Sequence, residues 1–284
     1  MILNEITAYL NRHLTDRPGI EQMVINPCFS GVLLENGDMG ISMNVRKGTG
    51  YSDAALNEQL KTFIGKDGMT VAAELEVEDD PVAGSVKLAL INALSQPFMT
   101  QDYLCKMGYH AEFGGTGYPD HYIANDKTVA IVGYGGNVRG VSKKAAKVFV
   151  TELEPDMFRS IVISATGFQR GPICADLVHA LEAAPVFRKA DTILLTGCTL
   201  VTGTMEEVLE QGKEKNIIVY GCSACFYPAP LFQRGVNVIS TRKITDSQTM
   251  VELLANCAGM VERFFPLASE ELVITRNHNK TYEN

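Results

Sequence analysis

The 284-residue sequence contains no tryptophan, only five histidines and no block of basic residues. Its 33 acidic side chains outnumber the 25 basic ones, which gives a formal net charge of −8. Because nucleic acids and anionic membranes attract basic patches, neither is an expected partner. No apolar run approaches the roughly 18 residues that a membrane span requires. The start, MILNEITAYLNRHL, also lacks the basic beginning and unbroken apolar core of a signal peptide. We therefore expect a cytoplasmic protein and leave open whether it forms a homo-oligomer.

The cysteine content argues against a disulfide framework. The chain has seven cysteines, an odd number, and no export signal, so reduced thiols are expected. A hydrophobic content of 46% and a charged content of 20% are typical of a soluble globular protein. The length corresponds to about two domains.

Residues 1–97 predict an α+β domain. The first 14 residues carry apolar side chains at helical spacing. Further on, Asn36-Gly37 separates two apolar runs, which predicts a β-hairpin. Residues 53–66 predict an amphipathic helix, and residues 82–97 predict a buried helix that ends at Pro97. Asn92 lies inside this buried helix and needs hydrogen-bond partners. It either ties down local backbone or faces an interdomain cleft, and Ser42 is a similar case.

Residues 98–126 are rich in Gly, Asp and Tyr and predict an interdomain connection. From Lys127 onward, short β-branched runs alternate with helical patterns, which predicts a Rossmann-like parallel sheet over 127–284. The predicted strands are TVAIV, KVFVT, DTILLT, NIIVY and VNVIS, and RSIVISA is a further strand or a loop. The predicted helices are ICADLVHALEAA, MEEVLEQGKEK and SQTMVELLANCAGM, and the polar tail from Thr275 is expected to fray.

The first strand of this region is followed by a glycine-rich loop with Gly133, Gly135 and Gly136. Glu152 ends the next strand, 19 residues after Gly133, where an acid would hold a ribose hydroxyl. The dinucleotide fingerprint is incomplete, because its third glycine would replace Val138. The loop therefore predicts either a nucleotide cofactor, NAD(P) or S-adenosylmethionine, or a simple turn beside a solvated glutamate. Glu152 is also the one candidate for a catalytic acid or base.

A second loop joins strand DTILLT to helix MEEVLEQ and carries small polar residues. Its candidates for ligand binding are Thr196, Gly197, Thr199 and Thr202, together with Cys198. Hydroxyl groups and free helix-start amides suit an anion or an oxygen-rich ligand. Alternatively, these threonines only cap and turn the chain, and that is the role we assign to Thr204, with Glu207 completing a capping box.

The third loop follows NIIVY and contains Gly221, Cys222, Ser223 and Cys225. The C-x-x-C spacing is compatible with a metal clamp, a redox pair or plain loop residues. A structural zinc site would need further ligands, which the sequence does not show nearby. Cys198 is a conceivable third thiolate if the two strands are neighbours. After VNVIS, Arg242 and Lys243 either meet an anionic ligand or are solvated.

Several stretches of the chain, taken together, resemble one prokaryotic family, which is described as putative heavy-metal chelation. They are GVLLENGDMGISM, LALINAL, VAIVGYGG, VFVTELEPD, TGCTLVTGTMEEVL and GCSACFYPAPLFQRGVNVIST. The resemblance implies a domain like the N-terminal capping domain of enolase, followed by a Rossmann-like domain. It also implies a ligand site in the cleft between them, formed by Asn92, Glu152, Thr196-Gly197, Thr199, Thr202 and Gly221 to Ser223. The family tends to have Asn at the position of Thr202 and Pro at that of Cys222.

These observations predict a protein that binds a small anionic or metal-associated ligand in an interdomain cleft. It would handle a metal chelate or help to make a chelator, and its cofactor would be a metal ion or a metal chelate. An enzyme that uses a nucleotide cofactor is the first alternative. Direct binding of a soft metal by Cys222, Cys225 and Cys198 is the second.

Overall fold

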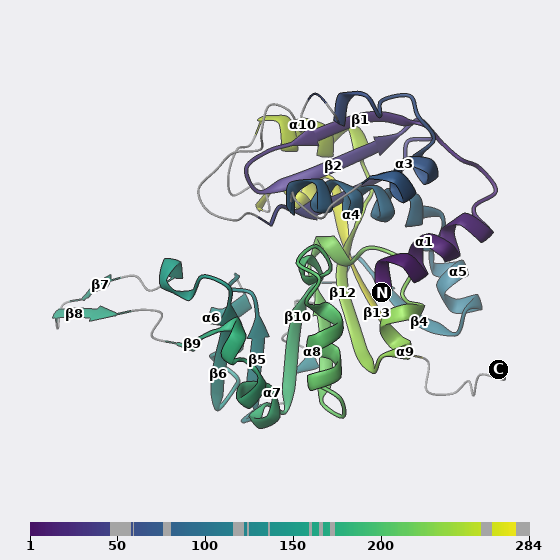
Figure 1. Ribbon diagram of the computed structural model, residues 1–284. Coiled ribbons are helices and arrows are strands. Elements are labelled where there is room, and N and C mark those ends of the chain that lie inside the picture. Colours follow the sequence, from purple (N-terminus) through teal and green to yellow (C-terminus); the bar gives the residue numbers. More distant parts are fainter. Residues whose placement is uncertain are drawn as a thin grey trace.

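The computed structural model describes residues 1–45, 58, 60–75, 81–115, 122–123, 125–135, 137–158, 161–164, 167–170, 174–256 and 263–276. Of the amphipathic helix predicted at 53–66, residues 53–57 and 59 lie outside these residues, and the described remainder is helical at 58, 60 and 61 and forms a turn or bend at 62–66. A small antiparallel sheet and a large, mostly parallel sheet form the two layers of the molecule (Figure 1). The α/β fold class expected from the sequence, a small α+β part followed by a Rossmann-like part, is confirmed.

The small sheet consists of β1 (Ile20–Ile25), β2 (Phe29–Leu34) and β3 (Met39–Met43). The hairpin predicted at Asn36-Gly37 joins β2 to β3, and Gly37 has the left-handed φ of +85° that the turn requires. Alternate residues of β2 enter different hydrophobic clusters: Val32 and Leu34 pack in the cluster that contains α4, and Leu33 in the one that contains α10. The sheet is thus covered on both faces.

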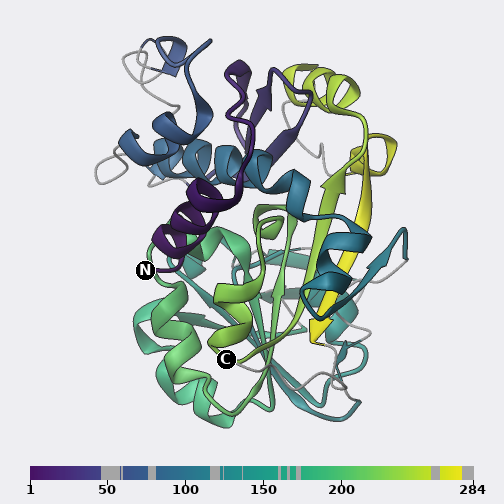
Figure 2. The same cartoon turned by 90° about the vertical axis from the view of Figure 1, so that its right-hand side faces the viewer.

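The two covering helices come from opposite ends of the chain. Helix α4 (Pro81–Ser95) is the buried helix predicted from the sequence. Helix α10 (Ser247–Asn256) follows the last parallel strand, and the sequence predicted it as a helix of the Rossmann-like part. Instead it lies on the small sheet, where the Asn26 side chain donates a hydrogen bond to the Leu254 carbonyl at 3.0 Å. Figure 2 shows β12 rising from the large sheet towards α10.

The large sheet has the strand order of a doubly wound fold. Its parallel strands are β5 (Thr128–Val132), β6 (Lys147–Glu152), β9 (Asp176–His179), β10 (Thr192–Thr196), β11 (Asn216–Tyr220) and β12 (Val236–Ile244). Numbered in sequence order, they are arranged 3-2-1-4-5-6, and the order reverses between β5 and β10. The five strands that the β-branched runs TVAIV, KVFVT, DTILLT, NIIVY and VNVIS predicted are all present.

Three segments differ from the sequence prediction. Of the helix predicted over 173–184, residues 174–183 are not α-helical: Asp176–His179 pairs with β6 as the edge strand β9, and a 3₁₀ turn, Ala180–Glu182, follows. The predicted connection contains α5 (Gln101–Lys106) and strand β4 (Tyr109–Phe113). The tail begins later than predicted, because β13 (Ser269–Arg276) pairs antiparallel with both β12 and β4. Short apolar runs satisfy helix and strand patterns equally, so pairing partners decide between them.

The remaining described elements cover the sheets or extend from them. They are α1 (Ile2–His13), α3 (Gly68–Glu74), α6 (Asn137–Val141), α7 (Ala184–Lys189), α8 (Met205–Gln211), α9 (Ala229–Gln233) and the hairpin β7 (Ile161–Ser164) with β8 (Gly167–Arg170). The hairpin pairs with neither larger sheet. Within the described ranges, no helix is long and apolar enough to cross a bilayer.

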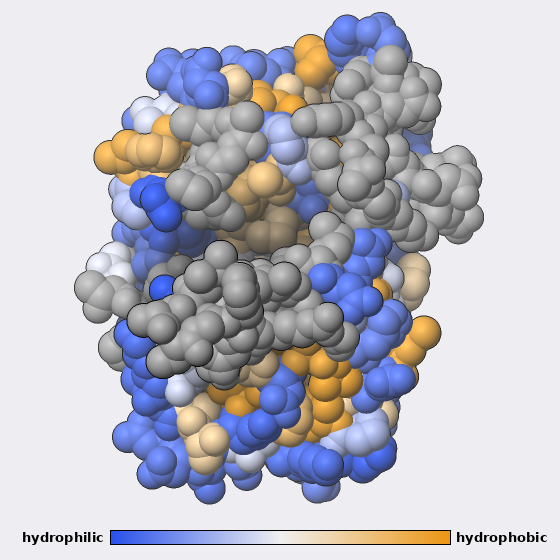
Figure 3. Space-filling model, turned by 90° about the vertical axis from the view of Figure 1, so that its left-hand side faces the viewer, coloured by the Kyte–Doolittle hydropathy of each residue, from blue (hydrophilic) through white to orange (hydrophobic). Residues whose placement is uncertain are grey.

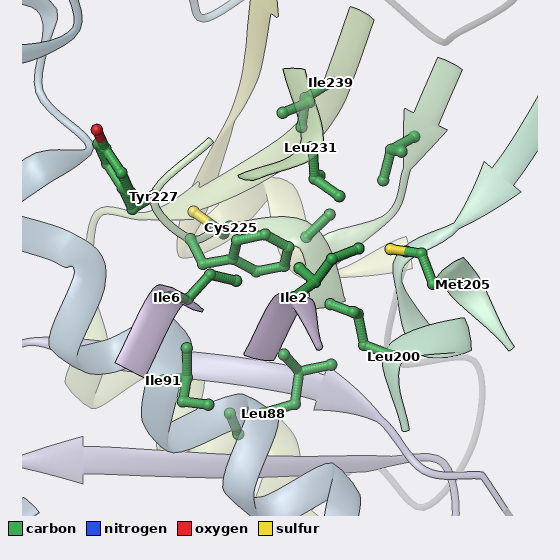
Figure 4. Packing of buried hydrophobic residues seen from close by; sticks show 14 of the residues in the cluster. Ile2, Ile6, Leu88, Ile91, Leu200, Met205, Cys225, Tyr227, Leu231 and Ile239 are labelled. Atoms are coloured by element: carbon green, nitrogen blue, oxygen red, sulfur yellow. The ribbon is translucent and has the colours of Figure 1, made fainter. Parts of the chain in front are cut away.

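One hydrophobic core joins the two parts of the molecule. Ile2 and Ile6 of α1 lie between Leu88 and Ile91 of α4 on one side and residues of the large-sheet part on the other (Figure 4). The residues on that second side are Leu200, Met205, Cys225, Leu231 and Ile239. The division into 1–97, 98–126 and 127–284 stays a prediction, and the core itself crosses the first boundary.

Candidate functional site at the strand ends

The carboxyl ends of the parallel strands point towards the small sheet (Figures 1 and 2). On one face the molecule is hollowed between its upper and lower parts, and pale to orange residues form the floor of the hollow (Figure 3). Ligands of doubly wound sheets bind in this position, beyond the strand ends where the order reverses. We use the name strand-end site for Gly133, Tyr134, Glu152, Thr196, Cys198 and Tyr220.

The glycine loop after β5 is held by its neighbours. Gly133 has a φ of +88°, and a Cβ there would lie 3.1 Å from Cγ2 of Thr196 at the end of β10. The Tyr220 hydroxyl, at the end of β11, lies 3.3 Å from the Val132 carbonyl oxygen and 3.4 Å from that of Gly133, and donates to this pair. The backbone conformation at position 133 therefore favours glycine, and a Cβ there would also press on the Thr196 side chain.

Glu152 turns back onto this loop. Its carboxylate accepts hydrogen bonds from the backbone N–H groups of Tyr134 and, at 3.2 Å, Leu153. The side chain is partly exposed, as are those of Tyr134, Thr196 and Tyr220. Gly135 is also partly exposed, and Gly136 lies outside the described residues. The structure thus brings Gly133 and Glu152 together, and part of the carboxylate already binds protein amides.

Cys198 lies in the turn after β10. Its thiol is 3.2 Å from the Thr196 hydroxyl. Burial raises the pKa of Cys198, and the negative charge of Glu152 raises it further, against the hydrogen bond from Thr196. The thiol is therefore neutral near pH 7, and a metal would have to displace its proton.

The hydroxyl groups of the predicted ligand-binding threonines mainly form hydrogen bonds within their own turn. The Thr199 hydroxyl donates to the Thr196 carbonyl at 2.7 Å, and the Thr202 hydroxyl to the Thr199 carbonyl at 3.2 Å. The predicted capping role of Thr204 is wrong. Its hydroxyl lies 2.8 Å from that of Thr202 and caps no helix amide, because Thr204 has helical backbone angles rather than the extended ones of a capping residue.

Asn92 and Ser223 lie together in a buried, hydrogen-bonded contact between the small-sheet part and the large-sheet part. The Asn92 amide is fully buried and donates to the carbonyls of Ile41, at 2.8 Å, and Ser223, at 3.2 Å. The Ser223 hydroxyl accepts the Met43 N–H at 2.9 Å and lies 3.3 Å from the Ser42 hydroxyl. Asn92 therefore both ties down backbone and joins the two parts, and no cleft separates it from Ser223.

The turns after β10 and β11 also touch directly. A Cβ on Gly197 would lie 2.9 Å from Cβ of Ala224. Gly221 has a φ of +100°, and its carbonyl accepts the Thr241 hydroxyl at 3.0 Å. The missing side chain of Gly197 permits the close contact of the turns, and the left-handed φ of Gly221 favours glycine there.

The C-x-x-C cysteines point into separate hydrophobic clusters. Cys222 packs with Phe29 and Ile41, and Cys225 packs in the main core, where burial raises its pKa to about 11. Among the residues described, no three His, Cys, Asp or Glu side chains gather where they could hold a metal ion. Cys222, Cys225 and Cys198 therefore form no such group.

Two members of the strand-end site, Tyr134 and Tyr220, were not singled out from the sequence. Tyr220 is the last residue of a strand and precedes a glycine, which is the position that would have indicated it. Arg242 and Lys243, considered for an anionic ligand, lie in β12 instead. Arg242 pairs with Glu271, and the Lys243 ammonium donates to the Met99 carbonyl at 2.8 Å.

Comparison with known proteins agrees with this architecture. A family model with the description "Putative heavy-metal chelation" matches residues 120–273, and a second model with the same description matches residues 8–95. The chain belongs to this family. No match to it is found among the curated proteins.

Two solved structures of the DUF364 family share the fold over almost the whole chain. The chain is similar to a protein of unknown function from Desulfitobacterium hafniense DCB-2, with a TM-score of 0.70 and 15% identity, covering 96% of this chain and 98% of the other. It is also similar to one from Pyrococcus horikoshii, with a TM-score of 0.66 and 18% identity, covering 97% and 100%. At these identities the similarity shows the fold.

Proposed function

We propose that this heavy-metal chelation family member binds a small metal-associated ligand at the strand-end site and handles a metal chelate. The observation that carries the proposal is the convergence of polar groups from neighbouring strand ends. These groups lie at the carboxyl ends of β6, β5, β10 and β11, which are adjacent in the sheet: Glu152, the Gly133 turn, Thr196 with Cys198, and Tyr220. This is the position at which doubly wound sheets bind ligands.

The charge of the site favours a metal-associated ligand over a free anion. Glu152 contributes a carboxylate, and Cys198 is a neutral thiol. The cations of β12 are engaged elsewhere, Arg242 with Glu271 and Lys243 with a backbone carbonyl. A bare anion would meet negative charge at Glu152, whereas a bound metal would be attracted to it.

A chelated metal fits better than a bare ion. The described residues offer one carboxylate and one thiol here, fewer side chains than a protein site normally supplies to a tightly held metal. The remaining coordination positions would be filled by the chelating molecule. Carboxylate and thiolate together would suit a borderline or soft divalent metal.

A nucleotide-cofactor enzyme is the second candidate. The 3-2-1-4-5-6 strand order and an acid at the end of the second strand favour it. However, Glu152 accepts the Tyr134 N–H of the glycine loop, which occupies part of the carboxylate that would bind a ribose.

Calorimetric titration of protein purified without an affinity tag tests the first proposal. The probes are Co²⁺ and Ni²⁺, each alone and as its histidine complex. We expect the complexes to bind, and Glu152→Gln and Cys198→Ser each to weaken binding at least tenfold. A glutamine at position 152 keeps an oxygen for the Tyr134 N–H, and it removes the charge and the acceptor of the Leu153 N–H. Glu154→Gln and Cys105→Ser, which change exposed side chains of the same types, are matched controls.

Unchanged affinity in both site variants would reject the assignment of these residues. The same protein is also heated with NAD, NADP and S-adenosylmethionine. A cofactor present at 100 times its Kd adds about 2.7 kcal/mol of stability. Stabilisation by a cofactor, without binding of either metal complex, would favour the second candidate.

A further inference from the structure

A groove lies between α1, α3 and α4, away from the strand-end site. It is an open groove with a volume of about 500 Å³, which is in the range of small-molecule sites. Its polar lining includes Asn4, Thr7, Asn11, Thr70, Glu74 and Lys87. Asn4, Thr7 and Asn11 share one face of α1, because their spacing follows the helical repeat.

Lys87 is a partly buried cation of this groove. The side chain rises from α4, is partly buried, and donates to the Leu75 carbonyl at 3.1 Å. Within the described ranges no carboxylate forms an ion pair with it. An ammonium has three donors, so two remain for another acceptor. Burial lowers the pKa of Lys87, as expected for a cation whose lost hydration is not replaced by a negative charge.

The walls add donors around this cation. The Asn11 side-chain oxygen accepts from Arg17 at 2.7 Å, which leaves the Asn11 amide N–H₂ group to donate, and Arg17 adds positive charge at the edge. Met69 and Ala72 supply a buried apolar floor. A ligand with an anionic oxygen end and a short apolar body complements such a lining.

We propose that this groove binds a small carboxylate, with the carboxylate oxygens on the Lys87 ammonium and the hydrocarbon body on Met69 and Ala72. Ammonium and amide donors match a carboxylate, and Glu74, the one carboxylate among the described lining residues, disfavours ligands with higher negative charge. The site is independent of the function proposed for the strand ends.

Competitive amine labelling of the full chain tests this site. The protein is treated with a trace of acetic anhydride at pH 8, with and without butyrate, and acetylation is measured by peptide mass spectrometry. A bound carboxylate stabilises the charged, unreactive form of the amine. We expect butyrate to slow acetylation of Lys87 several-fold and to leave Lys61, an exposed lysine outside the groove, unchanged.

Calorimetry with butyrate supplies the second measurement. Lys87→Met and Lys87→Gln should each weaken binding at least tenfold, and Lys61→Met, which removes the same charge elsewhere, should not. Melting curves of each variant establish that it is folded. Equal protection of Lys87 and Lys61, equal butyrate affinity in folded Lys87 variants, or protection by inorganic phosphate as strong as by butyrate would overturn the proposal.

Discussion

At the residue scale, the missing Cβ of Gly40 permits a close approach of the small sheet to the backbone of α4. Gly40 lies in β3 against α4, and a Cβ there would be 2.2 Å from the Ala89 carbonyl oxygen and 2.3 Å from the Ala93 nitrogen. These are backbone atoms, which cannot move aside as the end of a flexible side chain does. The helix and the strand must separate to admit a methyl group.

We therefore expect Gly40→Ala to lower the free energy of unfolding by about 3 kcal/mol or more, as severe overpacking does. Urea denaturation followed by circular dichroism measures the change. Gly140→Ala in α6 is the matched control, because nothing lies within 4 Å of that position. It should be neutral or add up to about 1 kcal/mol of helix propensity. Equal stability of the two variants would show that β3 does not lie on α4 in this way.

The cysteines differ in reactivity for reasons of burial and charge. Cys225 is buried with a pKa raised to about 11, and Cys105 on α5 is exposed. Only the thiolate reacts with alkylating agents. At pH 8 iodoacetamide should label Cys105 within minutes and Cys225 at least a hundredfold more slowly, until urea unfolds the chain. Peptide mass spectrometry measures both rates, and similar rates in the native protein would contradict the buried position.

At the scale of elements, α10 belongs to the small sheet in packing although it follows the large sheet in sequence. Leu254 is fully buried, and a Cβ added to Gly31 would lie only 2.5 Å from its Cδ1. Ser247 at the start of α10 donates to the Gly37 carbonyl in the hairpin at 2.7 Å. The helix closes one face of a three-stranded sheet whose other face is covered by α4.

Leu254→Ala should cost about 2–5 kcal/mol, the usual range for a fully buried leucine. Because the lost contacts are to the small sheet, hydrogen exchange should accelerate in β1 to β3 more than in β10 and β11. Mass spectrometry of exchanged peptides measures this. Leu153→Ala, which changes an exposed leucine, is the control, and faster exchange centred on β10 and β11 would contradict the placement of α10.

Helix α1 is tied to α9 by an ion pair. Arg234 donates to both carboxylate oxygens of Glu5, one at 2.9 Å, and this hydrogen bonding holds the pKa of Glu5 below its usual value of 4.5. A carboxyl with a lowered folded-state pKa stabilises the fold above the unfolded-state pKa and loses that contribution as pH falls through the folded value. The pair is partly exposed, so its contribution is modest.

Glu5→Gln should therefore lower stability by up to about 1 kcal/mol at pH 7. The difference from the native chain should shrink as the pH falls below about 4.5, because the native carboxyl then becomes protonated. Urea denaturation at a series of pH values measures it. Glu252→Gln, at an exposed position of α10, is the control, and a difference that grows on acidification would contradict the ion pair.

At the scale of the whole molecule, the two sheets share a core rather than meeting at a cleft. Ile2 and Ile6 pack among residues of both parts, and Tyr9 stacks on Tyr227 with ring centroids 3.6 Å apart. The joint of Asn92 with Ser223 is closed by hydrogen bonds. No cleft for a ligand therefore lies between these two residues.

A fragment comprising residues 1–97 should not fold by itself. It would expose the faces that α10 and the large-sheet part cover, and it would lose the partners of Ile2 and Ile6. We expect circular dichroism and proton NMR to show poor dispersion and no cooperative urea transition, whereas the full chain unfolds cooperatively. A cooperative transition of the fragment would show that the boundary predicted at residue 97 separates independent domains.

The sequence by itself determined the fold class and the family. Alternating β-branched runs and helical patterns indicated the parallel sheet, and Asn36-Gly37 indicated the hairpin. These signals are local, because they depend on backbone preference and on the spacing at which apolar residues recur along a helix or strand. Glu152 at a strand end and the glycines after β5 were likewise visible, since a doubly wound sheet fixes where strand ends meet.

Only the tertiary structure decided what each of these residues contacts. Residues 98–126 and 269–276 supplied strands because the edge beyond β12 pairs with them, and α10 covered the small sheet because its apolar face fits there. Cys222, Cys225 and Ser223 became interior residues because their turn is pressed against β3 and α4. Pairing and burial between distant segments depend on the whole chain, so no local pattern could have specified them.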